Sequence, residues 1–200
     1  MVIDTYYTKD MKEAVSPTTP TARAERKEKK MNKPILDACC GGKMFYFDKH
    51  DPNVLFQDIR QVSTTLCDGR KFEVIPDVVA DFTSMPYPNN SFRMVVFDPP
   101  HLKYSGSKKE PDGWQMIKYG VLLPGWKDVI AKGFSECFRV LMPGGFLIFK
   151  WNETDIKVSD ILKLTSHKPI FGHISGKRAN THWMCFMKEE MEDNSHVKLD

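Results

Sequence analysis

One acidic corner in the sequence combines residue types that can hold a ligand. The apolar run 95–97 is followed by Asp98, Pro99, Pro100 and His101. The run is typical of the end of a buried strand, and the prolines stop that strand because proline fixes φ and lacks an N–H. The corner thus presents one carboxylate and several unpaired carbonyl oxygens at a sheet edge, where ligands of open α/β sheets bind. These acceptors suit a flat polar group.

Carboxylates also follow earlier apolar runs, at Asp37, Asp58 and Asp81, and a small-residue turn at 38–42 follows the first. The carboxyl ends of parallel strands line one rim of a sheet. There a glycine turn lets a cofactor approach the backbone, the second acid can accept both hydroxyls of a ribose, and the third can accept an exocyclic purine amine. The set predicts a nucleoside-shaped cofactor site. Each acid alone also suits a turn residue that caps a helix, and the missing G-x-G-x-x-G argues against NAD.

The elements that position these residues alternate between strand and helix. The apolar runs predict strands at 34–38, 54–58, 77–81, 93–97 and 146–151, and a closing antiparallel pair at 170–174 and 182–187. Helical spacing predicts helices over 126–141 and 158–164, and a brief one over 43–49. Asp68 and Gly69 predict a hairpin between 63–66 and 71–75, for which a short irregular helix is the alternative. The expected fold is α/β and doubly wound, with a mostly parallel seven-stranded sheet and an antiparallel C-terminal hairpin.

Composition predicts a single soluble domain. The chain has 200 residues, of which 41% are hydrophobic and 28% charged, and a formal net charge of +3. This mild charge is compatible with a nucleic-acid partner and does not demand one. The five cysteines lack disulfide or metal-ligand spacing, and neither a signal peptide nor an apolar run of about 18 residues is present. We therefore expect a cytoplasmic protein with no membrane or metal partner.

The long connection 101–125 mixes cations with rings. It holds Lys103, Lys108, Lys109 and Lys118 together with Tyr104, Trp114 and Tyr119. The lysines suit phosphates and the rings suit bases, so the connection predicts a substrate lid; the alternative is a solvated lid whose rings pack on the domain. Lys177 and Arg178 fall in the loop of the terminal pair and suit phosphates too, or belong to an ordinary polar hairpin.

The ordered set of motifs resembles the class I S-adenosylmethionine-dependent methyltransferases. Within them it looks like the DPPY-type amino-methyltransferases, which methylate exocyclic amines of adenine or cytosine. The resemblance covers roughly residues 34–188, and its matching pieces are the first motif 36–42, Asp58, Asp81 with Phe82, the corner 98–101, and the turn 143–145 before the fifth strand. Two departures are the cysteines at 39 and 40, where glycine is usual, and His101, where Tyr, Phe or Trp is usual.

The resemblance implies a Rossmann-like fold, S-adenosylmethionine as the cofactor, and a role for each matching residue. It also implies a methyltransferase domain 34–188 with the lid 101–125. The polar and basic residues 1–33 predict an N-terminal extension to this domain, and the polar residues 189–200 predict a tail. The catalytic residues would be Asp98, Pro99, Pro100 and His101. The cofactor-binding residues would be Asp37, Ala38, Cys39, Cys40, Gly41, Gly42, Asp58, Ile59, Asp81, Phe82 and Asp98.

The chemistry of the corner fits this reaction. The exocyclic nitrogen of a nucleobase is a poor nucleophile because its lone pair is delocalised into the ring. Asp98 and the Pro99 carbonyl can accept its two N–H groups and favour a tetrahedral nitrogen, and positioning then suffices for transfer without a metal. We expect methylation of N6 of adenine in DNA, single-stranded or flipped out, with low sequence selectivity. RNA, a small amine, a protein side-chain amide, or an inactive cofactor-binding subunit are the alternatives.

Overall fold

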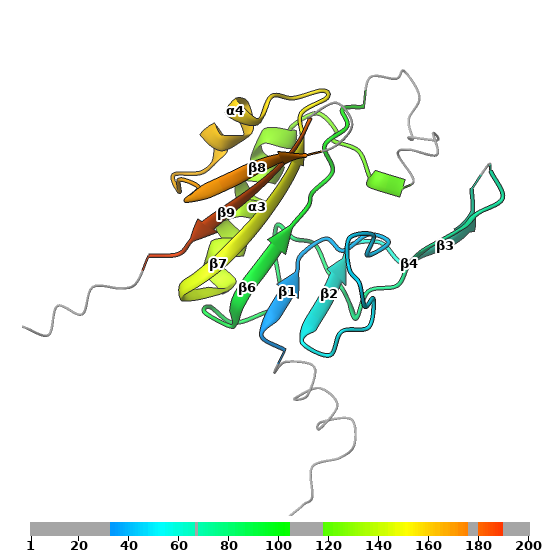
Figure 1. The fold of residues 1–200 in the computed structure, drawn as a ribbon, viewed down its shortest axis with the longest axis horizontal. Helices are drawn as coiled ribbons and strands as arrows, with labels where there is room; N and C mark the ends of the chain where they lie inside the picture. Colours follow the sequence, from blue (N-terminus) through cyan, green and yellow to red (C-terminus); the bar gives the residue numbers. More distant parts are fainter. Residues whose placement is uncertain (1–32, 67, 105–117, 176–179, 190–200) are drawn as a thin grey trace, which may run out of the picture. The chain divides into compact units, whose positions relative to one another are not determined.

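The computed structural model describes residues 33–66, 68–104, 118–175 and 180–189. Its main sheet has seven strands in the order β5-β2-β1-β6-β7-β9-β8. Figure 1 labels all of these strands except β5. The strands of this sheet are β1 (Ile35–Asp37), β2 (Val54–Asp58), β5 (Val78–Val79), β6 (Phe92–Phe97), β7 (Leu141–Asn152), β8 (Phe171–Ser175) and β9 (Thr181–Met187). All pairs among β5, β2, β1, β6 and β7 are parallel, whereas β9 runs antiparallel to β7 and to β8. The predicted sheet and its C-terminal hairpin are confirmed.

The central strands bury both of their faces, which explains their continuous apolar runs. Every residue of β2 is buried. Leu36 of β1 pairs with Leu55 of β2 on one side and with Val95 of β6 on the other. This register brings the carboxyl ends of β1 and β6 side by side.

One long helix, α3 (Trp126–Val140), covers the sheet through the predicted apolar face. Phe134 packs against Phe149 of β7 with ring centroids 4.8 Å apart and against Phe97 of β6 at 5.6 Å. Gly133 permits this approach, since a Cβ there would lie 2.6 Å from the Phe97 ring. The second predicted helix is present as α4 (Val158–Ile161) followed by the 3₁₀ turn η1 (Leu162–Leu164).

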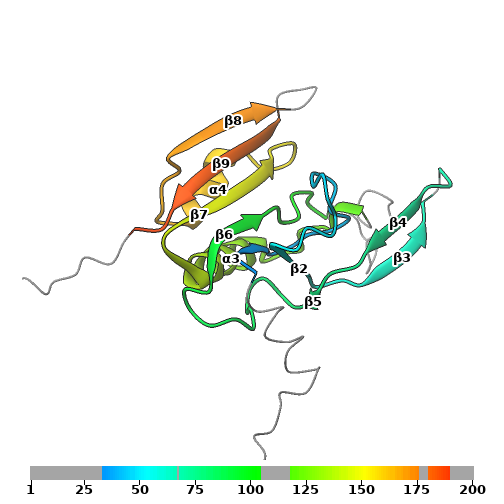
Figure 2. The ribbon, with the colours of Figure 1, turned by 60° about the horizontal axis from the view of Figure 1, so that its bottom comes forward.

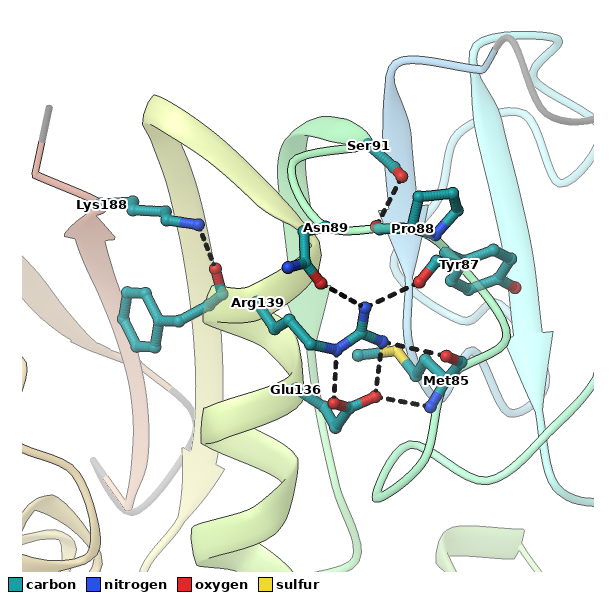
Figure 3. A network of polar contacts seen from close by, with 9 residues as sticks. Met85, Tyr87, Pro88, Asn89, Ser91, Glu136, Arg139 and Lys188 are labelled. Atoms are coloured by element: carbon teal, nitrogen blue, oxygen red, sulfur yellow. Dashed lines mark hydrogen bonds and ion pairs between the residues drawn. The ribbon is translucent and has the colours of Figure 1, made fainter. Parts of the chain in front are cut away.

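Arg139, in the last turn of α3, fastens the loop that leads into β6 (Figure 3). Its guanidinium donates to the Glu136 carboxylate at 2.6 Å, to the Tyr87 carbonyl at 2.7 Å and to the Met85 carbonyl at 3.0 Å. The Arg139 hydrogen bonds lower the pKa of Glu136. Glu136 also accepts the Met85 N–H at 2.7 Å. The network holds the start of β6, the strand that directly precedes Asp98.

The fifth parallel strand begins earlier than the sequence predicts. β7 starts at Leu141, opposite Phe92, and the pairing resumes at Phe146, opposite Met94. Four residues of β7 thus face a single residue of β6, so the segment 143–145 forms a bulge inside the strand rather than a turn before it. Gly144 has a φ of 71°, which favours glycine.

The brief helix predicted over 43–49 is wrong, and the hairpin after β2 is confirmed. Residues 43–49 form turns and bends. Gly41 and Lys43 have φ values of 48° and 53°, and a left-handed backbone at both positions prevents a helix from starting there. The hairpin pairs β3 (Val62–Thr65) with β4 (Lys71–Val74), and Figure 2 shows it projecting beyond the main sheet.

Within the described part of the chain, no helix is long and apolar enough to cross a membrane.

Candidate active site

A small cavity lies where β1 and β6 end. Its volume is about 80 Å³. It is lined by Cys39, Cys40, Gly41 and Gly42 from the turn after β1, by Asp98, Pro99 and His101 after β6, and by Met44, Phe45, Arg60, Lys118, Tyr119 and Lys150. The glycine turn and the acidic corner, more than 50 residues apart in sequence, therefore share one cavity because their strands are neighbours in the sheet.

Asp98 is held by a lysine that sequence reasoning missed. Lys150 of β7 donates from Nζ to Asp98 Oδ2 at 2.6 Å, and the two side chains are 25% and 21% exposed. The ammonium also lies 5.4 Å from the centroid of the Phe45 ring and 5.6 Å from that of Trp183. The two rings meet edge to face at 5.3 Å. Contact with two ring faces and one carboxylate fixes the position of the ammonium.

Asp37 is a fully buried carboxylate with one unpartnered oxygen. Its Oδ1 accepts the Cys39 N–H at 3.2 Å, while its Oδ2 has no hydrogen-bond partner in the described residues. Burial raises the pKa of Asp37 to about 7, opposed by the nearby Tyr46 hydroxyl and the Cys39 N–H. The negative charges of Asp98 and Asp58 raise the pKa of Asp37 further. The Tyr46 hydroxyl, whose hydrogen bond lowers the pKa of Asp37, thus lies within reach of this buried carboxylate.

Asp58 ties the glycine turn to β2. It is buried, and its Oδ2 accepts the Gly41 N–H at 2.9 Å. Its Oδ1 accepts from the Arg60 backbone N–H at 2.9 Å and from the Arg60 Nε at 3.0 Å. A Cβ on Gly41 would lie 3.9 Å from Arg60 Nη2, so the guanidinium covers both the carboxylate and the turn. The neighbouring Ile59 side chain is exposed.

Like Asp37, Asp58 and Ile59, the remaining predicted cofactor residues do not line this cavity. Asp81 is exposed and accepts from the Thr83 N–H and hydroxyl, each at 2.8 Å. Phe82 packs edge to face on Phe97 at 5.2 Å, and Ala38 belongs to the core. Asp81 thus makes local turn contacts, in a segment of turns and bends rather than at the start of the helix that the alternative interpretation requires.

The two cysteines of the turn are unreactive apolar residues. Cys39 and Cys40 are free thiols, and Cys40 packs in a cluster with Val54 and Phe56. Burial raises the pKa of both thiols. They therefore stay protonated at neutral pH and fill space beside the cavity.

His101 and Tyr119 form an aromatic pair at the cavity. Their ring centroids are 5.9 Å apart, and the Trp151 ring meets His101 edge to face at 6.3 Å. Burial lowers the pKa of His101, although the charge of Asp98 opposes this. The imidazole is therefore neutral at pH 7. On the other member of the pair, the Lys118 ammonium lies 5.0 Å from the centroid of the Tyr119 ring.

Only part of the predicted lid can be placed. The Lys103 ammonium lies 6.0 Å from the centroid of the Trp126 ring. The Tyr104 N–H donates to the Leu122 carbonyl at 3.0 Å. Neither Lys103 nor Tyr104 lines the cavity. The predicted substrate residues Lys108, Lys109, Trp114, Lys177 and Arg178 lie outside the described residues.

Comparison with known proteins finds a likeness in fold. No protein-family model matches the sequence, and no curated protein matches it. The crystal structure of the PH0226 protein from Pyrococcus horikoshii OT3 superposes with a TM-score of 0.51 at 12% sequence identity, covering 86% of this chain and 94% of that one. The strand order of the main sheet and the superposition over most of both chains are the evidence for the fold. The chain has a Rossmann-like, doubly wound fold.

Two further similar structures are methyltransferases. One is 1,6-didemethyltoxoflavin-N1-methyltransferase from Burkholderia thailandensis with bound 1,6-didemethyltoxoflavin and S-adenosylhomocysteine, with a TM-score of 0.45, 12% identity, and coverage of 78% of this chain and 71% of that one. The other is the antibiotic-resistance methyltransferase Kmr, with a TM-score of 0.44, 15% identity, and coverage of 88% and 96%.

Proposed function

We propose that this protein is an S-adenosylmethionine-dependent methyltransferase that acts on an exocyclic amine of a nucleobase, N6 of adenine in DNA. One observation carries the proposal. The glycine turn 41–42 and the acidic corner of Asp98 and Pro99 line the same cavity at the carboxyl ends of adjacent parallel strands. A methyl donor held at the first would face an amine held at the second.

The residues present fit the cofactor's charged end. Asp37, Asp58 and Asp98 lie close enough that the charges of the other two raise the pKa of Asp37. These carboxylates favour the sulfonium and ammonium groups of S-adenosylmethionine, while Arg60 and Lys150 pair with Asp58 and Asp98. The backbone of Gly41 and Gly42, which lines the cavity, would hold the methionine end, and a ribose would reach Asp58 in place of the Arg60 guanidinium. When bound, the cofactor supplies an activated methyl group.

Asp98 acts on the amine. Its Oδ2 is engaged by Lys150, which is its hydrogen-bond donor among the described residues, so Oδ1 remains to accept one N–H of the substrate. The Pro99 carbonyl accepts the other. Two acceptors on one nitrogen favour the tetrahedral geometry in which its lone pair faces the donor. Lys150 prevents the Asp98 carboxylate from rotating away from this orientation.

The aromatic pair suits a planar guest. His101 is neutral because burial lowers its pKa, so it offers a ring rather than a charge. Tyr119 lies beside it, and both line the cavity. Since a base inside a duplex cannot reach such a cavity, the substrate enters as a single strand or as a flipped-out nucleotide.

Transfer of a labelled methyl group tests the proposal. The protein is incubated with methyl-labelled S-adenosylmethionine and separate pools of DNA, RNA, protein and metabolites, and Asp98→Ala serves as the matched control. We expect label on adenine of the DNA pool, absent with Asp98→Ala. Label on RNA alone would change the substrate assignment, and label on protein or metabolites alone would refute a nucleobase substrate.

A further inference from the structure

We propose that a cleft beside the catalytic cavity binds the phosphodiester backbone of the single-stranded nucleic acid whose base is methylated. This inference rests on the proposed function and adds a substrate-binding surface formed mainly by residues outside the lid, with Lys118 as its one lid residue among those described. The cleft has a volume of about 400 Å³. One wall is the loop 41–50 after β1, and the other is the hairpin of β3 and β4.

The cleft is strongly basic. Its lining cations are Lys43, Lys49, Arg70, Lys71 and Lys118, with His50 beside them. Glu73 is the single carboxylate among the described lining residues. Both walls contribute cations, so a polyanion lying between them is neutralised from two sides.

The cations at the rim are available to a phosphate. Lys49 is exposed, and Lys71 pairs with Glu73 at 2.8 Å with a side chain that is 73% exposed. Arg70 contacts Asp68 through an equally open pair. Exposed ion pairs contribute about 0–1 kcal/mol, so a phosphate competes with them readily. Lys43 differs, because it is buried over the Phe56 ring at 4.0 Å and donates to the Lys49 carbonyl.

The cleft adjoins the catalytic cavity. Gly41, Gly42, Met44 and Lys118 line both spaces. Lys118 also lies over Tyr119, the ring beside His101. A single-stranded nucleic acid whose phosphates lie in the cleft can therefore place one of its bases in the neighbouring cavity, beside Asp98.

Exposed apolar side chains accompany the cations. Phe47, on the loop that forms one wall, is fully exposed, and Met44 in the lining is 57% exposed. Rings beside a basic groove are the arrangement by which proteins bind single strands, with bases stacked on rings and phosphates on cations. The cofactor is a poorer occupant, since S-adenosylmethionine carries no phosphate and has a net positive charge. The charge of the cleft thus selects nucleic acid.

Charge reversal tests the cleft. Lys49→Glu with Lys71→Glu is compared with Lys132→Glu with Lys168→Glu, which changes net charge equally at exposed lysines outside both spaces. Affinity for a fluorescent single-stranded oligonucleotide is measured by anisotropy over a range of salt concentrations, with S-adenosylhomocysteine present. We expect the cleft variant to bind at least about 10-fold more weakly, and the slope of log affinity against log salt to fall by about 1.4 for two lost phosphate contacts. The control variant should change less than about threefold.

Three further readouts decide the interpretation. If the charge-reversed variant fails to fold, Lys49→Gln with Lys71→Gln replaces it, and we expect the same decrease in the slope of log affinity against log salt. Cofactor affinity by calorimetry should be unchanged in all variants, and its loss in the cleft pair would overturn the assignment by giving the cleft to the cofactor. Equal oligonucleotide affinity in cleft and control variants of a protein that still methylates DNA would refute the cleft alone, whereas a wild-type protein that binds no nucleic acid would refute the substrate as well.

Discussion

Lys150 offers a sharp test of how the site is built, because it contacts the acid that we assign to catalysis. At an effective dielectric constant of about 20, opposite charges at the observed 2.6 Å attract by about 6 kcal/mol before desolvation is subtracted. Both side chains are about a quarter exposed, so the net contribution lies between a surface pair and a buried one, at about 1–3 kcal/mol. We therefore expect Lys150→Met to lower the free energy of unfolding by about 1–3 kcal/mol.

The effect of this variant on turnover separates positioning from mere stability. Without its ammonium the Asp98 carboxylate is free to rotate, and misplacement of a reacting group by about 1 Å costs on the order of 100-fold in rate. Lys150→Met should therefore lower kcat by about 10- to 100-fold and leave cofactor affinity within about threefold. Lys150→Arg keeps the charge and should restore most of kcat. Wild-type kcat in Lys150→Met, measured below its unfolding temperature, would refute a positioning role.

Three further predictions concern charge and burial. The raised pKa of Asp37, about 7, means that the folded state holds a proton that the unfolded chain has lost, so unfolding free energy should fall between about pH 4 and pH 7, by up to about 4 kcal/mol; Asp37→Asn should flatten this slope in denaturant titrations. His101→Phe should keep kcat within about threefold at pH 7, because the imidazole is already neutral and serves as a ring; a loss above 100-fold in single-turnover assays would assign it a proton or a hydrogen bond instead. Arg139→Met should lower the free energy of unfolding, measured in urea, by about 2–4 kcal/mol, since it leaves a carboxylate and two carbonyls without their hydrogen-bond donor. A decrease below about 0.5 kcal/mol would contradict the network in Figure 3.

The strands and the long helix could be predicted because their signals are local. Continuous apolar runs mark strands that are buried on both faces, and the apolar spacing around Phe134 marks α3. The turn residues Asp68 and Gly69 also carry a local signal, and the hairpin forms where they predict it. The helix predicted over 43–49 failed because backbone conformation at Gly41 and Lys43 decides that segment, and side-chain periodicity does not report it.

The candidate site was only partly readable, since its remaining parts depend on long-range contacts. The order of acids and glycines placed Asp98 and the turn 41–42 at one sheet edge. The ion pair of Asp98 with Lys150 spans 52 residues, and its sequence signal is a single lysine in the apolar run 146–151. No pattern indicated that Arg60 covers Asp58, or that the hairpin stands across from the loop 41–50 to form a basic cleft.

Asp98→Ala, assayed for both turnover and cofactor binding, tests the central claim most directly. Asp98 is assigned to the substrate amine, so labelled methyl transfer to DNA should fall by at least about 100-fold while the cofactor dissociation constant from calorimetry changes less than about threefold. Turnover that survives the substitution, or cofactor affinity that falls in step with turnover, would contradict the account.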